Sequence, residues 1–255
     1  GQVPMIPAWG YGYFQSKERY ASADENMGVA AQYRRLRVPI DCVVQDWQYW
    51  GTDNANWNGM EFSNPTFHNY QEMIDSIHAM HAHNIISTWA NFGPNTKPYA
   101  YFKEHGELIK QGDEIMNSTY PTDAGVAIYD TYNPDARDAY WNFLYDGIIS
   151  KGIDGYWLDS SEPDHYQGGD EMEETFDFVT GMGCTWRSVR NAFPLVHVGG
   201  VYDHHRAEPG LADKRCIILT RSAYAGQQRT GANTWSGDVT ASWETFQKQI
   251  PAALN

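Results

Sequence analysis

Two aspartates in this 255-residue sequence have the side chains that cleavage of a glycosidic bond requires. Asp159 ends the segment GYWLD, and Asp238 ends the segment NTWSGD. Such cleavage needs two carboxyl groups that flank the bond, one ionised and one protonated. Arg221 can keep a neighbouring carboxylate ionised by Coulomb attraction, and burial by aromatic rings can raise the pKa of the partner acid. Two carboxylates, an arginine and aromatic walls are the minimum set for this chemistry.

Each of these residues also has a structural interpretation. Asp159 can cap the segment after its strand, Asp238 can cap a helix, and Arg221 can form a structural ion pair. The aromatic content favours a carbohydrate site, because a flat ring with a polar edge stacks well on a sugar. With 10 Trp and 17 Tyr the chain is rich in such rings, although most of them serve as core residues.

The elements that must position these residues alternate along the chain. Short apolar runs typical of buried strands are followed by stretches whose apolar residues fall on one helical face. This order, without an internal repeat, predicts an α/β fold with a parallel sheet and helices outside it. The predicted strands cover residues 9–15, 40–47, 85–89, 155–158, 216–220 and 232–235, and the predicted helices cover residues 22–37, 70–80, 133–152 and 238–255.

The positions of the polar residues favour a barrel over an open doubly wound sheet, although both fit the order of the elements. Five residues lie at the carboxyl end of a predicted strand or just beyond it: Asp46, Trp89, Asp159, Arg221 and Asp238. In a (β/α)8 barrel these ends converge on one mouth, where active sites are built. In an open sheet they would be spread along an edge.

Four segments resemble glycoside hydrolase family 31. The nucleophile region of that family is similar to GYWLDSSEPD at residues 155–164, and its acid/base region is similar to TRSAYAGQQRTGANTWSGD at residues 220–238. The segments around its first two strands look like YGYFQSKERY at residues 11–20 and VPIDCVVQDWQYWG at residues 38–51. The resemblance extends in order from about residue 9 to residue 255.

This resemblance implies a role for each candidate residue. Asp159 would be the nucleophile and Asp238 the general acid/base of a retaining double displacement. Asp46 would hydrogen-bond sugar hydroxyls, and Arg221 would contact both the sugar and the nucleophile. The aromatic walls would be Trp89, Trp157 and Trp235.

The resemblance also bears on the architecture. It implies a helix over residues 191–206, against the local strand propensity and the pair Gly199-Gly200. It implies a (β/α)8 TIM-type barrel, of which about six strands fall in residues 1–255 as one catalytic domain. We expect the last two strands and the flanking β-sandwich domains to be absent from this chain.

The identity of the sugar depends on Trp47, which directly follows Asp46. A large ring there can occupy the space of a C6 hydroxymethyl group, which favours an α-xylosidase. Alternatively, Trp47 faces the barrel wall, and the chain is then an α-glucosidase or α-transglucosylase. A non-catalytic carbohydrate-binding barrel is a third possibility, but it would be expected to lack one of the two carboxylates.

The charge balance bears on partners. With 18 Lys+Arg against 32 Asp+Glu the formal net charge is −14, which disfavours nucleic acid and anionic membranes as partners. We expect an oligosaccharide or glycoside substrate, no membrane span and no cofactor. The oligomeric state and the compartment stay open, with a periplasmic or extracellular location preferred to the cytoplasm.

Metal and cysteine chemistry are also disfavoured. Cys42 and Cys216 lie in or beside apolar runs and are expected to be buried small hydrophobic residues. A metal-dependent hydrolase would have to use His197, Asp203, His204 and His205, which fall in the stretch assigned to a helix. We therefore expect no metal.

Overall fold

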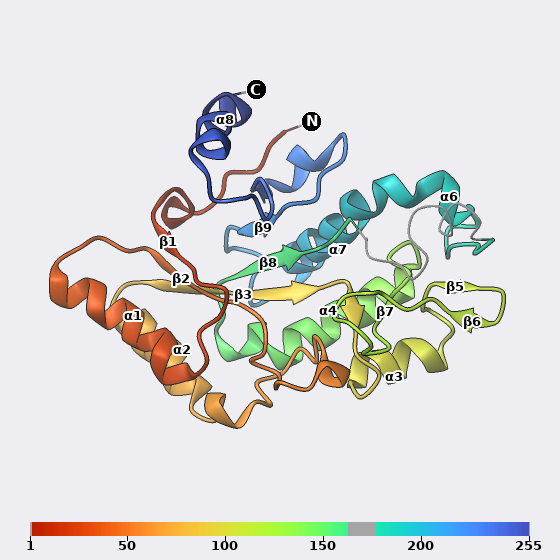
Figure 1. Ribbon diagram of the computed structural model, residues 1–255, viewed down its shortest axis with the longest axis horizontal. Coiled ribbons are helices and arrows are strands. Elements are labelled where there is room, and N and C mark those ends of the chain that lie inside the picture. The colour runs from red at the N-terminus through yellow and green to blue at the C-terminus, as the bar shows by residue number, and fades with distance from the viewer. Residues whose placement is uncertain (1, 163–176, 255) are drawn as a thin grey trace.

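The computed structural model describes residues 2–162 and 177–254 of the chain. Its centre is a curled sheet of six strands in which every neighbouring pair is parallel (Figure 1). The strands, in their order across the sheet, are β1 (Phe14–Gln15), β2 (Cys42–Gln45), β3 (His83–Trp89), β8 (Gly155–Asp159), β9 (Ile218–Thr220) and β10 (Asn233–Thr234).

The α-helices are α1 (Ala23–Leu36), α2 (Tyr70–Ala79), α3 (Lys97–Glu104), α4 (Pro134–Gly147), α6 (Trp186–Val189), α7 (Phe193–Ala207) and α8 (Trp243–Leu254). Helices α1, α2, α4 and α7 lie in the connections between the sheet strands and contribute buried side chains to the main core, whereas α8 follows the last strand and lies apart from the sheet (Figure 1). Two small antiparallel pairs join β4 (Asn91–Phe92) to β7 (Ala127–Ile128) and β5 (Lys110–Gln111) to β6 (Glu114–Ile115). The short 3-10 turns are η1 (Ala8–Tyr11), η2 (Asn54–Asn56), η3 (Pro65–Phe67), η4 (Ile149–Lys151), η5 (Arg190–Ala192) and η6 (Gln227–Thr230). None of the described helices has the length and apolar character needed to cross a membrane.

The local start signals act as the sequence predicts. The Ser22 side chain accepts a hydrogen bond from the Glu25 N–H and begins α1. Asn133 accepts one from the Asp135 N–H, with Pro134 in the first turn of α4. The helix implied by the resemblance forms as α7, so tertiary packing overrides the local strand propensity there.

Several boundaries differ from prediction, and three of them lie near the two ends of the chain. The strand predicted over residues 9–15 is the turn η1 followed by only two residues of β1. The strand predicted over residues 232–235 is the two-residue β10. The last helix begins at Trp243 rather than at Asp238, because the Ser242 hydroxyl accepts from the Thr245 N–H and makes the cap. Asp238 therefore lies in a loop.

The two faces of the sheet bury different residues, as the alternation of side chains along a strand requires. On the inner face Cys42, Val44, Ile85 and Ile217 form a small cluster. Strand β8 approaches its neighbours closely there: a Cβ on Gly155 would lie 2.1 Å from the Ile217 side chain. This close approach explains the glycine.

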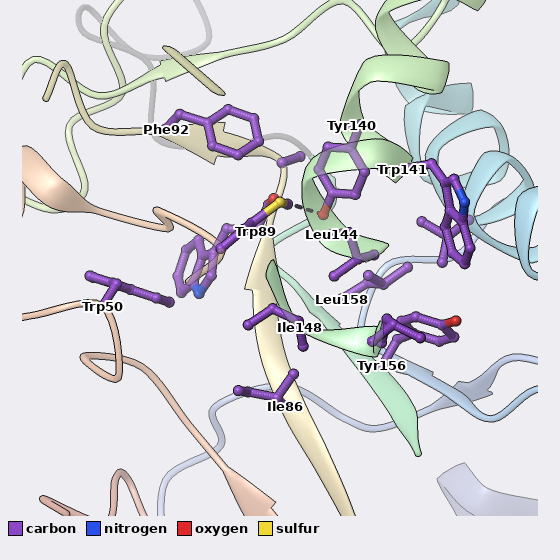
Figure 2. Close-up of a cluster of buried hydrophobic side chains, with 14 of the residues drawn as sticks. Trp50, Ile86, Trp89, Phe92, Tyr140, Trp141, Leu144, Ile148, Tyr156 and Leu158 are labelled. Carbon is purple, nitrogen blue, oxygen red and sulfur yellow. Dashed lines mark hydrogen bonds between the residues drawn. The ribbon is translucent and has the colours of Figure 1, made fainter. Parts of the chain in front are cut away.

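The outer face carries the main core (Figure 2). Ile86 and Leu158 of the sheet pack there with Leu144 of α4. The Tyr140 hydroxyl donates to the backbone oxygen of Trp89 over 3.0 Å. This bond connects α4 to the carboxyl end of β3.

Candidate active site

A pocket of about 910 Å³ opens at the carboxyl ends of the parallel strands. Phe14, Val44 and Leu219 from the sheet contribute to its lining. All eight residues that the sequence singled out also line it: Asp46, Trp47, Trp89, Trp157, Asp159, Arg221, Trp235 and Asp238. Residues that are up to 192 positions apart in the chain (238 − 46) thus meet around one cavity.

Asp159 is the last residue of β8, beside Trp89 of β3 in the register of the sheet. Ser160 adopts a left-handed backbone conformation with φ 45°, and its N–H donates to Asp159 Oδ1 over 2.8 Å. Burial raises the pKa of Asp159 to about 6, against the charge of Arg221 and the Ser160 hydrogen bond, which lower it. A strained residue beside a perturbed carboxyl is typical of functional sites.

Arg221 joins several groups at the edge of the pocket. Its Nε lies 2.5 Å from Glu162 Oε1, its Nη2 donates to Ser160 Oγ over 3.1 Å, and its Nη1 lies 3.5 Å from Asp238 Oδ2. Glu162 also accepts from the Ser222 hydroxyl. Sequence reasoning noted Glu162 only as part of the motif GYWLDSSEPD and gave it no role. Its position three residues after Asp159 was the signal that could have marked it as a site residue. Pro163 and Asp164, which end that motif, lie outside the described residues.

Asp238 does not have the buried environment that the sequence led us to expect. Its side chain is 96% exposed, and residues 238–244 are all exposed. Trp235 packs edge-on against Trp157, with ring centroids 5.6 Å apart, but it leaves the Asp238 carboxyl uncovered. The expectation of burial is wrong because Asp238 lies in a loop rather than at the start of a packed helix.

Asp46 is the most perturbed carboxyl group of the pocket. Its residue is only 9% exposed, and burial, together with the nearby charge of Asp159, raises its pKa to about 8. The Trp47 N–H donates to Asp46 Oδ1 over 2.7 Å and partly offsets this rise. Asp46 therefore holds its proton to a higher pH than Asp159 does.

Of two aromatic side chains that the sequence did not single out, Trp57 supports one wall from behind and Tyr120 is part of it. Trp57, which is 1% exposed, packs against Trp47 and Trp89 with centroid distances of 5.6 and 4.8 Å. Tyr120 lines the pocket and stacks on Trp89 at 5.7 Å. Burial and the charges of Asp159 and Asp46 raise the pKa of Tyr120. Both rings come from loops, where strand patterns give no signal.

Over residues 3–255 the chain matches the model of the glycosyl hydrolases family 31 TIM-barrel domain. The chain belongs to glycoside hydrolase family 31. The fold prediction is thereby confirmed: the six parallel strands form part of a (β/α)8 barrel.

Relatives within family 31 include enzymes with two different names. An α-xylosidase from Saccharolobus solfataricus is 37% identical over 255 residues, which is 100% of this chain and 32% of that protein. An α-glucosidase from the same organism is 24% identical over 283 residues, covering 100% of this chain and 38% of that protein. The crystal structure of an α-xylosidase from Xanthomonas citri matches with a TM-score of 0.88 and 34% identity, covering 98% of this chain and 27% of that one. The chain thus spans about a third of the length of these relatives.

The histidines considered as metal ligands have separate partners in this family 31 barrel. His197 Nδ1 lies 2.7 Å from the Tyr129 hydroxyl, His204 Nε2 lies 2.8 Å from Asp138, and His205 Nδ1 lies 2.8 Å from the Tyr156 hydroxyl. Within residues 2–162 and 177–254, no group of three His, Cys, Asp or Glu side chains is placed to hold a metal ion.

Cys42 and Cys216 are both buried, as the sequence predicts.

Proposed function

We propose that the protein is a retaining α-glycoside hydrolase in which Asp159 is the nucleophile and Asp238 the general acid/base. One observation carries this proposal. The two aspartates line the same pocket, and Arg221 lies close enough to influence both of them. Membership of family 31 supports it.

The reaction would proceed in two steps. The Asp159 carboxylate attacks C1 of the sugar while Asp238 gives its proton to the leaving oxygen, which forms a β-glycosyl-enzyme ester and releases the aglycone. Asp238 then takes a proton from water, the water oxygen attacks C1, and the ester bond breaks to release the α-anomer and the free carboxylate. Retention by this route requires the carboxyl groups to be about 5–5.5 Å apart.

The two carboxyl groups differ in how far they are prepared for these steps. Since the pKa of Asp159 is about 6, its nucleophilic form predominates at neutral pH. Asp238 is exposed, so the described residues around it do not supply the desolvation that keeps an acid catalyst protonated.

We propose an α-xyloside as the substrate. Trp47 lines the pocket beside Asp46, and a ring there limits the space for a C6 hydroxymethyl group. The α-xylosidase named above, at 37% identity, supports the same choice. The relative named α-glucosidase makes an α-glucoside the second candidate.

Substitution of the two aspartates tests the mechanism. Asp159→Ala should abolish turnover of every α-glycoside. Asp238→Ala should retain activity on substrates with good leaving groups, which need little protonation, and azide should raise that activity by replacing water as the nucleophile. The two roles would be exchanged if azide rescued Asp159→Ala with retained configuration of the glycosyl azide and Asp238→Ala with inverted configuration.

A further inference from the structure

Trp47, the residue proposed to limit the size of the sugar, is in contact with two side chains of different character. The ring of Trp57 packs against it with centroids 5.6 Å apart and planes at 53°. The guanidinium carbon of Arg19 lies 5.4 Å from the centroid of the Trp47 ring. Trp47 itself is half-buried, so its orientation depends on these contacts.

The contact with Trp57 belongs to the fixed core. Trp57 is 1% exposed, and its Nε1–H donates to Asn91 Oδ1 over 3.0 Å. Its ring also packs edge-on against Trp50 at 5.3 Å. This contact cannot be removed without opening the core.

The contact with Arg19 lies beside the pocket. Arg19 is half-buried in the segment between β1 and α1, next to Glu18, which lines the pocket. A planar guanidinium stacks well on an indole face, and the ring quadrupole attracts its charge. This contact can be removed while the core around Trp57 stays intact.

We infer that Arg19 is a positioning residue for the sugar selectivity of this pocket: its guanidinium holds the Trp47 indole where the ring narrows the space beside Asp46. The inference rests on the proposed function. The Trp47 N–H donates to Asp46 Oδ1 over 2.7 Å, so the backbone of Trp47 is already fixed relative to the carboxyl. The ring itself is constrained by Trp57 and by Arg19.

Arg19 acts through the ring rather than through its charge on the carboxyl groups. The charges that most affect Asp159 are those of Arg221, Asp238 and Glu162. Those that most affect Asp46 are the charges of Asp159 and Glu18. Removing the guanidinium should therefore change selectivity and leave the pH profile in place.

The test is a double-mutant cycle between Arg19 and Trp47, read as the ratio of kcat/KM for aryl α-xyloside and aryl α-glucoside. Arg19→Met should shift this ratio toward the glucoside by about 3- to 30-fold, the range expected for loss of one cation–π contact. The kcat for the xyloside and the acid limb of its pH profile should not move. Arg19→Lys should fall between wild type and Arg19→Met, because an ammonium keeps the charge but not the planar face.

Two further variants sharpen the cycle. In a Trp47→Ile background, Arg19→Met should have no further effect on the ratio. Lys103→Met is the matched control, because it removes a cation 6.0 Å from the ring of Tyr99 on α3, outside the pocket. If Arg19→Met does not fold, Arg19→Lys and Arg19→Gln carry the same comparison.

Three results would overturn the inference while the proposed function stands. The first is an unchanged ratio of kcat/KM values in Arg19→Met. The second is a change in that ratio which is the same with Trp47 and with Trp47→Ile. The third is a displaced acid limb in Arg19→Met that returns to its original place in Arg19→Lys. If the unmutated protein hydrolyses neither glycoside, the proposed function fails and the inference fails with it.

Discussion

The two sides of the pocket differ in how firmly the chain holds them. At the ends of β2 and β3, Asp46 and Trp89 are 9% and 8% exposed, and Trp57 behind them is 1% exposed. After β10 the Asp238 side chain is 96% exposed, and Trp243 of α8 is 87% exposed. The groups proposed to hold the sugar are thus packed in place, whereas the described residues leave the proposed acid/base open to solvent.

The largest effect that should separate the two sides is on stability. Trp57→Ala removes a fully buried ring and the hydrogen bond to Asn91, which should cost about 3–5 kcal/mol in the free energy of unfolding. Trp235→Ala, on the exposed side, removes a half-buried ring and should cost about 1 kcal/mol. Urea unfolding of the two variants measures the difference, and equal costs would show that the two sides are equally well packed.

A pH-dependent effect should follow from Asp46. Because its pKa rises from 3.8 to about 8 on folding, the folded protein binds this proton more tightly than the unfolded chain. The associated stability is fully present below about pH 4 and is lost as the pH rises through about 8. Asp46→Asn removes the buried charge and keeps the acceptor for the Trp47 N–H. It should therefore stabilise the protein at pH 9 by a few kcal/mol, at about 1.4 kcal/mol per pKa unit.

The comparison is made with thermal unfolding at pH 4 and pH 9. The advantage of Asp46→Asn should vanish at pH 4. Asp238→Asn is the matched control on the exposed side, where the carboxyl is solvated, and it should have no comparable effect. If Asp46→Asn raises the thermal stability equally at both pH values, burial of the charge is not the cause of the stabilisation.

The contrast between the two sides also marks the limit of what the sequence could predict. Residues at strand ends could be placed, because apolar runs locate the strands and a parallel barrel brings their ends together; Asp46 and Asp159 meet in this way. Glu162 could not be paired with Arg221, because the partner lies 59 positions away and local patterns carry no information about it. Trp57 comes from a loop, and the exposure of Asp238 depends on packing rather than on its neighbours in sequence.

A smaller effect concerns the acid limb of kcat/KM. The proposed nucleophile must be ionised, so kcat/KM should rise as the pH passes about 6, the pKa of Asp159. The charge of Arg221 lowers this pKa, so Arg221→Met should move the limb to higher pH. Arg35→Met is the control, because Arg35 is exposed on α1, donates to Gln32 and lies outside the pocket lining. If the acid limb of Arg221→Met stays in place, Arg221 does not lower the pKa of Asp159.

Trapping the covalent intermediate tests the central claim most directly. A 5-fluoroglycosyl fluoride should form a long-lived ester, because the fluorine slows its hydrolysis more than its formation. Digestion and fragmentation mass spectrometry should then place one added glycosyl unit on Asp159 itself, and Asp159→Ala should not be labelled. A label on Asp46 or Glu162, or turnover with inversion and no covalent adduct, would contradict the account.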